Sequence, residues 1–129
     1  MQVLVDGRFL KVTICPLNRI TDGIVENKEI LMPLFDFAAI AEQLPQSWKS
    51  TGLGQVGSAR IKVLRMDEQA YEEETHGYNE GLLVVSGLLR LSIADKEIRV
   101  GAGQMYLVEA GTAHAVLPGS EGTLVIIDV

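Results

Sequence analysis

The second half of the chain consists of short hydrophobic segments separated by turn residues. After Ser58 these segments are rich in Val, Leu and Ile, and they are ARIKVLRM, GLLVV, LLRLSI, EIRV, QMYLV, HAVL and TLVIIDV. Tight turns are predicted at Ser86-Gly87, between GLLVV and LLRLSI, and at Ala94-Asp95-Lys96, before EIRV. Many short strands with turns between them are typical of a β-sandwich or barrel.

The N-terminal residues predict a β-hairpin from Gln2 to Leu17. Its segments QVLV and FLKVTI favour strands, and Asp6-Gly7 between them suits a tight turn. Pro16 ends the second strand because it has no backbone N–H to donate. Residues 18–28 contain a second Asp-Gly pair and indicate turns and short extended pieces. With the hairpin, the chain has roughly eight or nine predicted strands, enough to close a small barrel or two-sheet jelly roll.

One helix is predicted, over residues 36–48. Asp36 can cap its start, and apolar residues recur at helical spacing from Phe37 to Leu44. Pro45 limits its length. The following stretch, STGLGQVGS, is rich in Gly and Ser and predicts a loop that leads into the barrel.

The composition is that of one globular domain. The chain has 129 residues, of which 47% are hydrophobic and 22% charged, close to the averages of ordinary domains. We therefore expect a single domain, with the hairpin and helix in residues 1–50 and the barrel in residues 58–129. Cys15 is the one cysteine; it lies in an apolar segment and is expected to be buried and inert.

Charge and hydropathy argue against several classes of partner. The net charge of −6 leaves no basic surface for nucleic acid or anionic lipid. No apolar run approaches the roughly 20 residues of a membrane-spanning helix. The start, MQVLVDGRFLKV, lacks the charged and then apolar order of a secretory signal. We expect a cytoplasmic protein with a small-molecule ligand, and the absence of a dinucleotide fingerprint or phosphate loop argues against a nucleotide.

Candidate chemistry centres on the two histidines, His76 and His114. Residues two apart on a strand share a face, so Glu74 and His76 can project into the barrel together, with Glu72 on the same face. Glu80 opens the next predicted strand and can re-enter the same interior, while His114 begins a later strand. Two imidazoles and two carboxylates converging in this way would suit a first-row divalent metal: Fe, Mn, Ni or Zn.

The spacing of these residues resembles two motifs of the cupin superfamily. The first motif runs G(x)5HxH(x)3-4E(x)6G and the second runs G(x)5PxG(x)2H(x)3N. The positions that keep the motif residue are His76, Glu80, Gly87, Gly103, Gly111 and His114. The resemblance is dense from about Asp67 to Pro118 and implies an all-β, double-stranded β-helix (jelly-roll) barrel. The helix before the barrel is also similar to small stand-alone cupins, some of them described as resembling mannose-6-phosphate isomerases. The N-terminal hairpin is not part of this pattern.

Three positions depart from the motifs. Glu74 stands at the first histidine position, Glu109 at the proline position and Pro118 at the last position. Cupin metal sites usually carry three histidines and one glutamate, so the resemblance implies a metal held by Glu74, His76, Glu80 and His114. If one carboxylate stays out of the coordination sphere, the others form the two-histidine, one-carboxylate set of non-haem Fe(II) oxygenases.

Several other polar residues favour structural roles. Tyr78 and Tyr106 lie on or near half-buried strands, where aromatic residues more often pack than bind ligands. Arg65 and Arg90 are expected to point outward as solvated charges. Glu109 suits an exposed turn as well as a ligand contact.

Different functions therefore stay open. The first is a metal-dependent cupin that binds a small polar organic molecule and acts on it as an oxygenase or isomerase. The second is a metal-free binding or sensor module, in which the two histidines are simply hydrogen-bonded at a polar barrel mouth. A third is a mainly structural role, because the hairpin supplies strand edges that can pair with another chain. Homodimers are common among cupins, and the resemblance implies one here.

Overall fold

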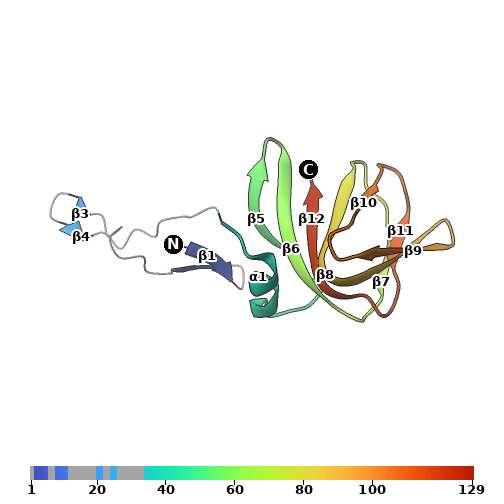
Figure 1. Cartoon of the computed structure of the whole chain (residues 1–129). Coiled ribbons are helices and arrows are strands. Elements are labelled where there is room, and N and C mark those ends of the chain that lie inside the picture. The colour runs from blue at the N-terminus through green and yellow to red at the C-terminus, as the bar shows by residue number, and fades with distance from the viewer. Residues whose placement is uncertain (1, 6–7, 12–19, 22–23, 26–33) are drawn as a thin grey trace.

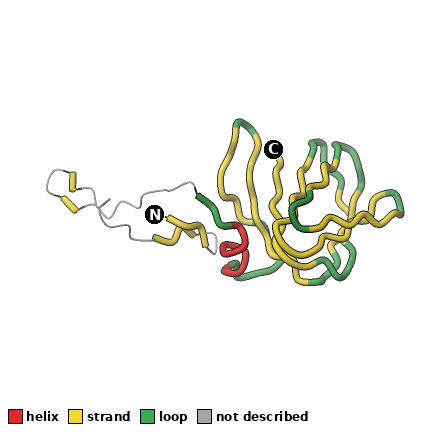
Figure 2. The backbone as a smooth tube through the Cα atoms, in the orientation of Figure 1, coloured by secondary structure: helices red, strands yellow, loops and turns green. Residues whose placement is uncertain are grey.

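The computed structural model describes residues 2–5, 8–11, 20–21, 24–25 and 34–129 (Figure 1). Within them, one antiparallel sheet of eight strands curls into a barrel. Its strands are β5 (Thr51–Val56), β6 (Ala59–Asp67), β7 (Tyr71–Glu74), β8 (Glu80–Ile93), β9 (Lys96–Gly101), β10 (Met105–Val108), β11 (His114–Val116) and β12 (Glu121–Asp128). The strand order is β5-β6-β12-β8-β11-β7, and β9 and β10 also pair with β8. This architecture confirms the predicted all-β jelly-roll barrel, with loops joining the strands at its ends (Figure 2).

Strand β8 runs without interruption through Ser86-Gly87, so the prediction of a tight turn there is wrong. Gly87 has a φ of 84° and Gly122 of β12 has a φ of 104°. A Cβ atom on Gly87 would lie 2.0 Å from the backbone oxygen of Glu121. Glycine is therefore required because two backbones approach closely, and it marks a bend within one long strand. The turn at Ala94-Asp95 is confirmed, with φ values of 51° and 62°.

The segment STGLGQVGS is not a loop, because most of it is strand β5. Thr51 and Val56 pair with Val63 and Ala59 of β6, and the register shifts between Gly52 and Gly54. Glycines weaken a strand but are accommodated at a bulge on an edge strand. Leu53 is the buried residue of β5 and holds it against the barrel.

Helix α1 (Phe37–Gln43) is shorter than the predicted 36–48. Asp36 caps it as expected, since its carboxylate accepts a hydrogen bond of 3.1 Å from the Ala39 amide. The helix ends because Leu44 precedes Pro45, whose ring disfavours the helical conformation of the preceding residue. Leu44 is extended, with φ of −65° and ψ of 135°.

The barrel strands bury hydrophobic side chains on both faces. Leu82 and Val84 of β8 point into the barrel core, whereas Leu83 and Val85 of the same strand pack with the outer cluster under α1. Helix α1 lies over β6 and β12 and contributes Ile40 to that outer cluster. Burial on both faces explains why GLLVV is a continuous apolar run without alternation.

Among the described residues, four short strands precede the helix. Strand β1 (Gln2–Val5) pairs with β2 (Arg8–Lys11), and β3 (Ile20–Thr21) pairs with β4 (Ile24–Val25). The pairing of β1 with β2 confirms the hairpin as far as it is described, while residues 12–19, with Cys15 and Pro16, lie outside the described residues. Strands β1 and β2 form a sheet of their own, so the prediction that the hairpin helps to close the barrel is wrong. The eight-stranded sheet of the barrel instead includes β5.

No helix in the described part of the chain has the length and apolar character needed to cross a membrane.

Candidate metal centre

Four predicted residues lie at or next to the ends of three barrel strands. Glu74 is the last residue of β7, Glu80 the first of β8 and His114 the first of β11. His76 lies in the loop after β7 rather than on the strand itself. Glu72 and Glu74 line the same cavity, as the two-residue period of a strand predicts.

Two hydrogen bonds join the loop that carries His76 to the turn before His114. The Gly111 amide donates to the His76 carbonyl at 2.8 Å, and the Ala110 amide donates to Oδ1 of Asn79 at 2.8 Å. Gly111 has a φ of 80°, a conformation that favours glycine. These bonds bring the two histidine-bearing loops together, although 38 positions separate the histidines in the chain (114 minus 76).

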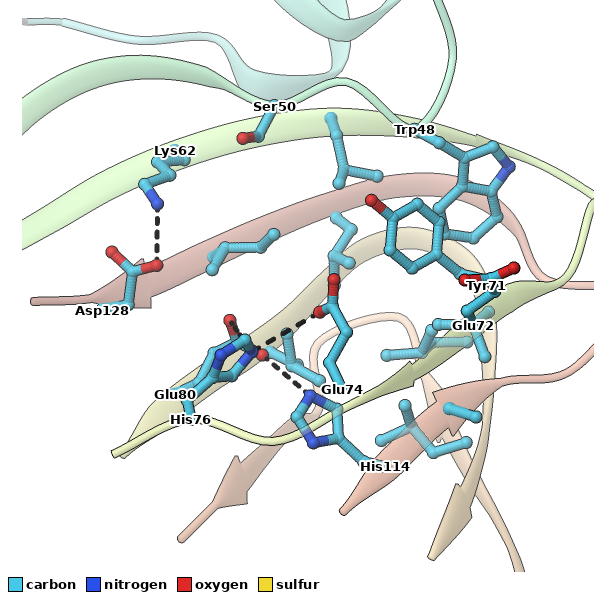
Figure 3. A pocket seen from close by; sticks show the side chains of 18 of the residues that line it. Trp48, Ser50, Lys62, Tyr71, Glu72, Glu74, His76, Glu80, His114 and Asp128 are labelled. Atoms are coloured by element: carbon cyan, nitrogen blue, oxygen red, sulfur yellow. Dashed lines mark hydrogen bonds and ion pairs between the residues drawn. The ribbon is translucent and has the colours of Figure 1, made fainter. Parts of the chain in front are cut away.

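The four side chains point toward one another (Figure 3). Nε2 of His76 lies 3.4 Å from a Glu74 oxygen and 3.7 Å from Oε2 of Glu80. Nε2 of His114 lies 3.4 Å from Oε1 of Glu80. Glu74, His76 and His114 each offer a donor atom, and these atoms all lie within 4.8 Å of one another. Ligand atoms around an ion at about 2.1 Å are about 3.0–3.4 Å apart, so the observed spacing is close to that of a coordination sphere.

The imidazole of His114 is oriented for binding through Nε2. Its Nδ1 lies 3.0 Å from the carbonyl oxygen of Thr112, which can only accept, so Nδ1 carries the proton and donates. In the neutral ring, Nε2 then keeps its lone pair toward Glu80 and His76. A second hydrogen bond of this kind is what fixes the tautomer of histidine ligands in metalloproteins.

The imidazole of His76 is held in another way. It stacks on Tyr78 with ring centroids 5.0 Å apart and 7° between the planes. Its Nε2 is buried and has no hydrogen-bond partner within the described residues. Buried polar atoms are nearly always paired, so this atom is available to coordinate a metal ion.

The donor set fits a divalent metal ion. Glu80 and His114 are buried, at 7% and 4% exposure, and Glu74 and His76 are half-buried. Two carboxylates gathered around the imidazole nitrogens concentrate negative charge, and a bound cation would offset it. Oxygen and nitrogen donors of this kind suit first-row divalent ions.

The cluster forms one end of a cavity of about 230 Å³. Part of its wall consists of aliphatic side chains of the barrel core, among them Leu64, Leu82, Leu89, Leu91, Leu124 and Ile126. Trp48 and Tyr71, with ring centroids 6.0 Å apart, stand on the side away from the cluster (Figure 3). The cavity is smaller than the roughly 300–1,000 Å³ of drug-sized sites, so it suits a small ligand.

The family model of the cupin domain matches residues 63–129, which is more than half of the chain. The chain belongs to the cupin domain family. A search of curated proteins gives no significant match.

Solved structures agree with this fold. A cupin-2 domain protein of Shewanella frigidimarina has a TM-score of 0.67 at 22% identity and covers 74% of this chain and 93% of its own. A cupin superfamily protein of Desulfitobacterium hafniense has a TM-score of 0.61 at 20% identity, covering 79% and 92%. The EutQ protein of Clostridium difficile has a TM-score of 0.54 at 16% identity, covering 61% and 59%. Identities this low support the fold alone.

Of the polar residues outside the candidate metal set, this cupin uses most for structure. Arg65 donates to the carbonyls of Ala41 and Leu44 and so caps helix α1, and it does not line the cavity. Arg90 pairs with Glu97, and the Glu109 carbonyl accepts from Thr112 in an exposed turn. Both arginines lie outside the cavity as expected, but Arg65 is half-buried against α1 and is not a solvated charge. Tyr106 packs against the core as expected, whereas Tyr78 lines the cavity.

Sequence reasoning missed two charged residues of the cavity wall, Lys62 and Asp128. The signal was available: Lys62 has the same strand parity as Leu64, and Asp128 the same parity as Leu124 and Ile126. A charged residue that shares parity with core residues points toward the interior. The sequence gives no comparable signal for Trp48 and Tyr71. Trp48 lies in a loop and Tyr71 begins a short strand, so strand alternation does not predict which way their side chains point.

Proposed function

We propose that this cupin binds one divalent transition metal ion through Glu74, His76, Glu80 and His114, and a small polar organic ligand in the adjoining cavity. The observation that carries the proposal is the buried Nε2 of His76, which has no hydrogen-bond partner among the described residues and faces two carboxylates. The tautomer of His114 set by Thr112 supports it independently.

Each residue has a distinct part. The Thr112 carbonyl holds His114 with its Nε2 lone pair toward the cluster, and Tyr78 holds the ring plane of His76. Glu80 spans both histidines with its two oxygens, and Glu74 supplies the second carboxylate. When bound, the metal supplies Lewis-acid or oxygen-binding chemistry. The aliphatic part of the wall contacts the apolar part of the ligand.

The reaction class we propose is that of a metal-dependent oxygenase or isomerase. A two-histidine site with one or two carboxylates leaves coordination positions for a ligand. The identity of the metal separates the two reactions, because iron favours oxygen chemistry, whereas zinc or manganese favours Lewis-acid isomerisation.

The test is elemental analysis of protein purified without a chelator or a His-tag. We expect about one transition metal ion per chain, and its loss in Glu80→Ala and His114→Ala. Glu73→Ala is the matched control, because Glu73 is an exposed neighbour that does not line this cavity. Wild-type protein that stays metal-free after Fe, Mn, Ni and Zn are offered would contradict the proposal.

One observation favours a second function, a metal-free binding or sensor module. Glu74 stands where the cupin motif has a histidine, and a carboxylate is a weaker donor for soft metals. In that case the cavity binds its ligand without metal, and the ligand affinity is the same before and after zinc is offered to the protein.

We also propose a homodimer. Among the described strands, β5 pairs with β6 alone, so its other edge is open, and Val56 at its end is 69% exposed. Light scattering coupled to size-exclusion chromatography tests this, and a stable monomer would refute it.

A further inference from the structure

Two aromatic residues and a carboxylate line the cavity on the side away from the candidate metal centre. Trp48 lies in the loop before β5, and Tyr71 and Glu72 begin β7. The rings of Trp48 and Tyr71 have centroids 6.0 Å apart, with 32° between their planes. Figure 3 shows that these residues stand apart from the charged pair formed by Lys62 and Asp128. We call Trp48, Tyr71 and Glu72 the aromatic end of the cavity.

Specific contacts hold the indole of Trp48 at this end. The Trp48 amide donates to the carbonyl of Arg65 at 2.9 Å, and the indole N–H donates to the carboxylate of Asp67. The backbone of Trp48 has a φ of 63°, which is uncommon for a bulky residue. Strained residues of this kind persist where surrounding contacts fix them, and they are concentrated at functional sites. The position of the ring is therefore well defined.

The charges of the cavity leave negative charge at the aromatic end. In the described part of the chain, the lining carries one ammonium group, that of Lys62, and four carboxylates, those of Glu72, Glu74, Glu80 and Asp128. Lys62 pairs with Asp128 at 2.7 Å, and a divalent ion would offset Glu74 and Glu80. The ion pairs among the described residues do not involve Glu72. The carboxylate of Glu72 is therefore the one that neither Lys62 nor a bound metal would offset.

The buried carboxylate of Asp128 also argues against an anionic ligand. Asp128 is 4% exposed, and its Oδ1 has no hydrogen-bond partner among the described residues, although Nη2 of Arg60 lies 3.3 Å away. Arg60 lies outside the cavity lining, and its side chain is 51% exposed, so solvent screens its charge. A wall rich in carboxylates repels an anion and attracts a cation. The cavity therefore favours a positively charged ligand.

We propose that the aromatic end binds the ammonium group of a small organic cation, whose other, uncharged polar end reaches the His76–His114 cluster. This inference rests on the proposed function, because it assigns the ligand of the same cavity. A cation is attracted to the faces of indole and phenol rings, and the nearby carboxylate of Glu72 adds an opposite charge. The substrate class is therefore a small organic ammonium compound, and Trp48, Tyr71 and Glu72 determine specificity for it.

The experiment compares a cation with an uncharged molecule of the same shape. Choline and its carbon analogue, an alcohol in which a tert-butyl group replaces the trimethylammonium group, are titrated by calorimetry into zinc-loaded and metal-free protein. The quaternary nitrogen of choline has no lone pair, so it cannot coordinate the zinc ion. Benzylamine and benzyl alcohol form a second pair, in which the cation has N–H donors. In zinc-loaded wild type we expect each cation to bind about fivefold or more tighter than its neutral partner.

Two variants test the residues of the aromatic end. Glu72→Gln and Tyr71→Leu should each lower the preference for the cation about threefold or more, while Tyr71→Phe retains it. Glu73→Gln is the matched control, because Glu73 is an exposed neighbour that does not line this cavity, and it should keep the preference. The affinity of the neutral partner should stay the same in all four variants, which shows that the cavity remains folded.

Three results would overturn the inference: no binding of either cation, equal binding of cation and neutral partner by wild type, or an unchanged preference in Glu72→Gln or Tyr71→Leu. A preference that persists in metal-free wild type and falls in Tyr71→Leu supports the ammonium site even where elemental analysis refutes the metal centre. Stoichiometric zinc without any preference refutes the ammonium site alone.

Discussion

Glu74 and His114 are directly opposite each other in the antiparallel pairing of β7 with β11. Residues opposite each other on neighbouring antiparallel strands have Cβ atoms about 4.5–5.5 Å apart, so the register places a carboxylate next to an imidazole. The glutamate at the usual histidine position is therefore part of the cluster, and it is not a member of a solvated acidic run.

Replacing Glu74 by Gln should weaken metal binding. The amide keeps the shape of the side chain but loses the charge that offsets a divalent ion, so we expect zinc affinity to fall about tenfold or more. Competition with a chelating dye measures the change. Glu73→Gln, on the exposed face of β7, is the control and should leave the affinity unaltered. Equal affinities of the two variants would place Glu74 outside the coordination sphere.

The stacking of Tyr78 on His76 makes a separate prediction. Tyr78→Phe keeps the stacked ring and should bind zinc as wild type does, while Tyr78→Ala frees the imidazole and lowers affinity about threefold to tenfold. The same dye competition provides the measurement. If Tyr78→Phe also lost affinity, the phenol hydroxyl and not the stacked ring would be the important group.

Glu97 of β9 leads to a prediction about how the stability of the fold depends on pH. Hydrogen bonds from Arg90 and then from Arg99 hold the pKa of Glu97 below its ordinary value of 4.5. A carboxylate with a lowered pKa stabilises the fold above its unfolded-state pKa and loses that contribution as pH falls through the folded-state pKa. Glu97→Gln should therefore be less stable than wild type at neutral pH, with the difference vanishing well below pH 4.5. Urea unfolding midpoints across this range test it, and a difference that persists at low pH would assign it to packing.

The candidate site was predictable because its residues occupy fixed motif spacings. The motif spacings predicted His76, Glu80 and His114 once the chain was expected to form a barrel. The two-residue period of a strand added Glu74 to the predicted site. The joining of the two loops by the Gly111 and Asn79 hydrogen bonds was not predictable, because it depends on tertiary contacts between distant segments.

Two errors in the fold prediction concern glycines. Gly52 and Gly54 suggested a loop but lie in edge strand β5, and Gly87 suggested a turn but lies inside β8. A glycine has the same sequence signal whether it allows a turn, a bulge or the close approach of a second backbone. Only the position of β12 against β8 distinguishes the last case.

A series of Gly-to-Ala substitutions separates these roles by their effect on the free energy of unfolding. Gly52→Ala meets no atom within 4 Å and has no positive φ, so it should change stability by less than about 0.5 kcal/mol. Gly103→Ala also meets no atom but has a φ of 81°, and should destabilise by about 1 kcal/mol.

Gly87→Ala combines a φ of 84° with a Cβ 2.0 Å from a backbone oxygen that no rotamer change can move. It should destabilise by more than about 3 kcal/mol, because the pairing of β8 with β12 must shift. Urea denaturation measures all three, and a Gly87→Ala variant as stable as Gly103→Ala would show that the two strands tolerate separation at this point.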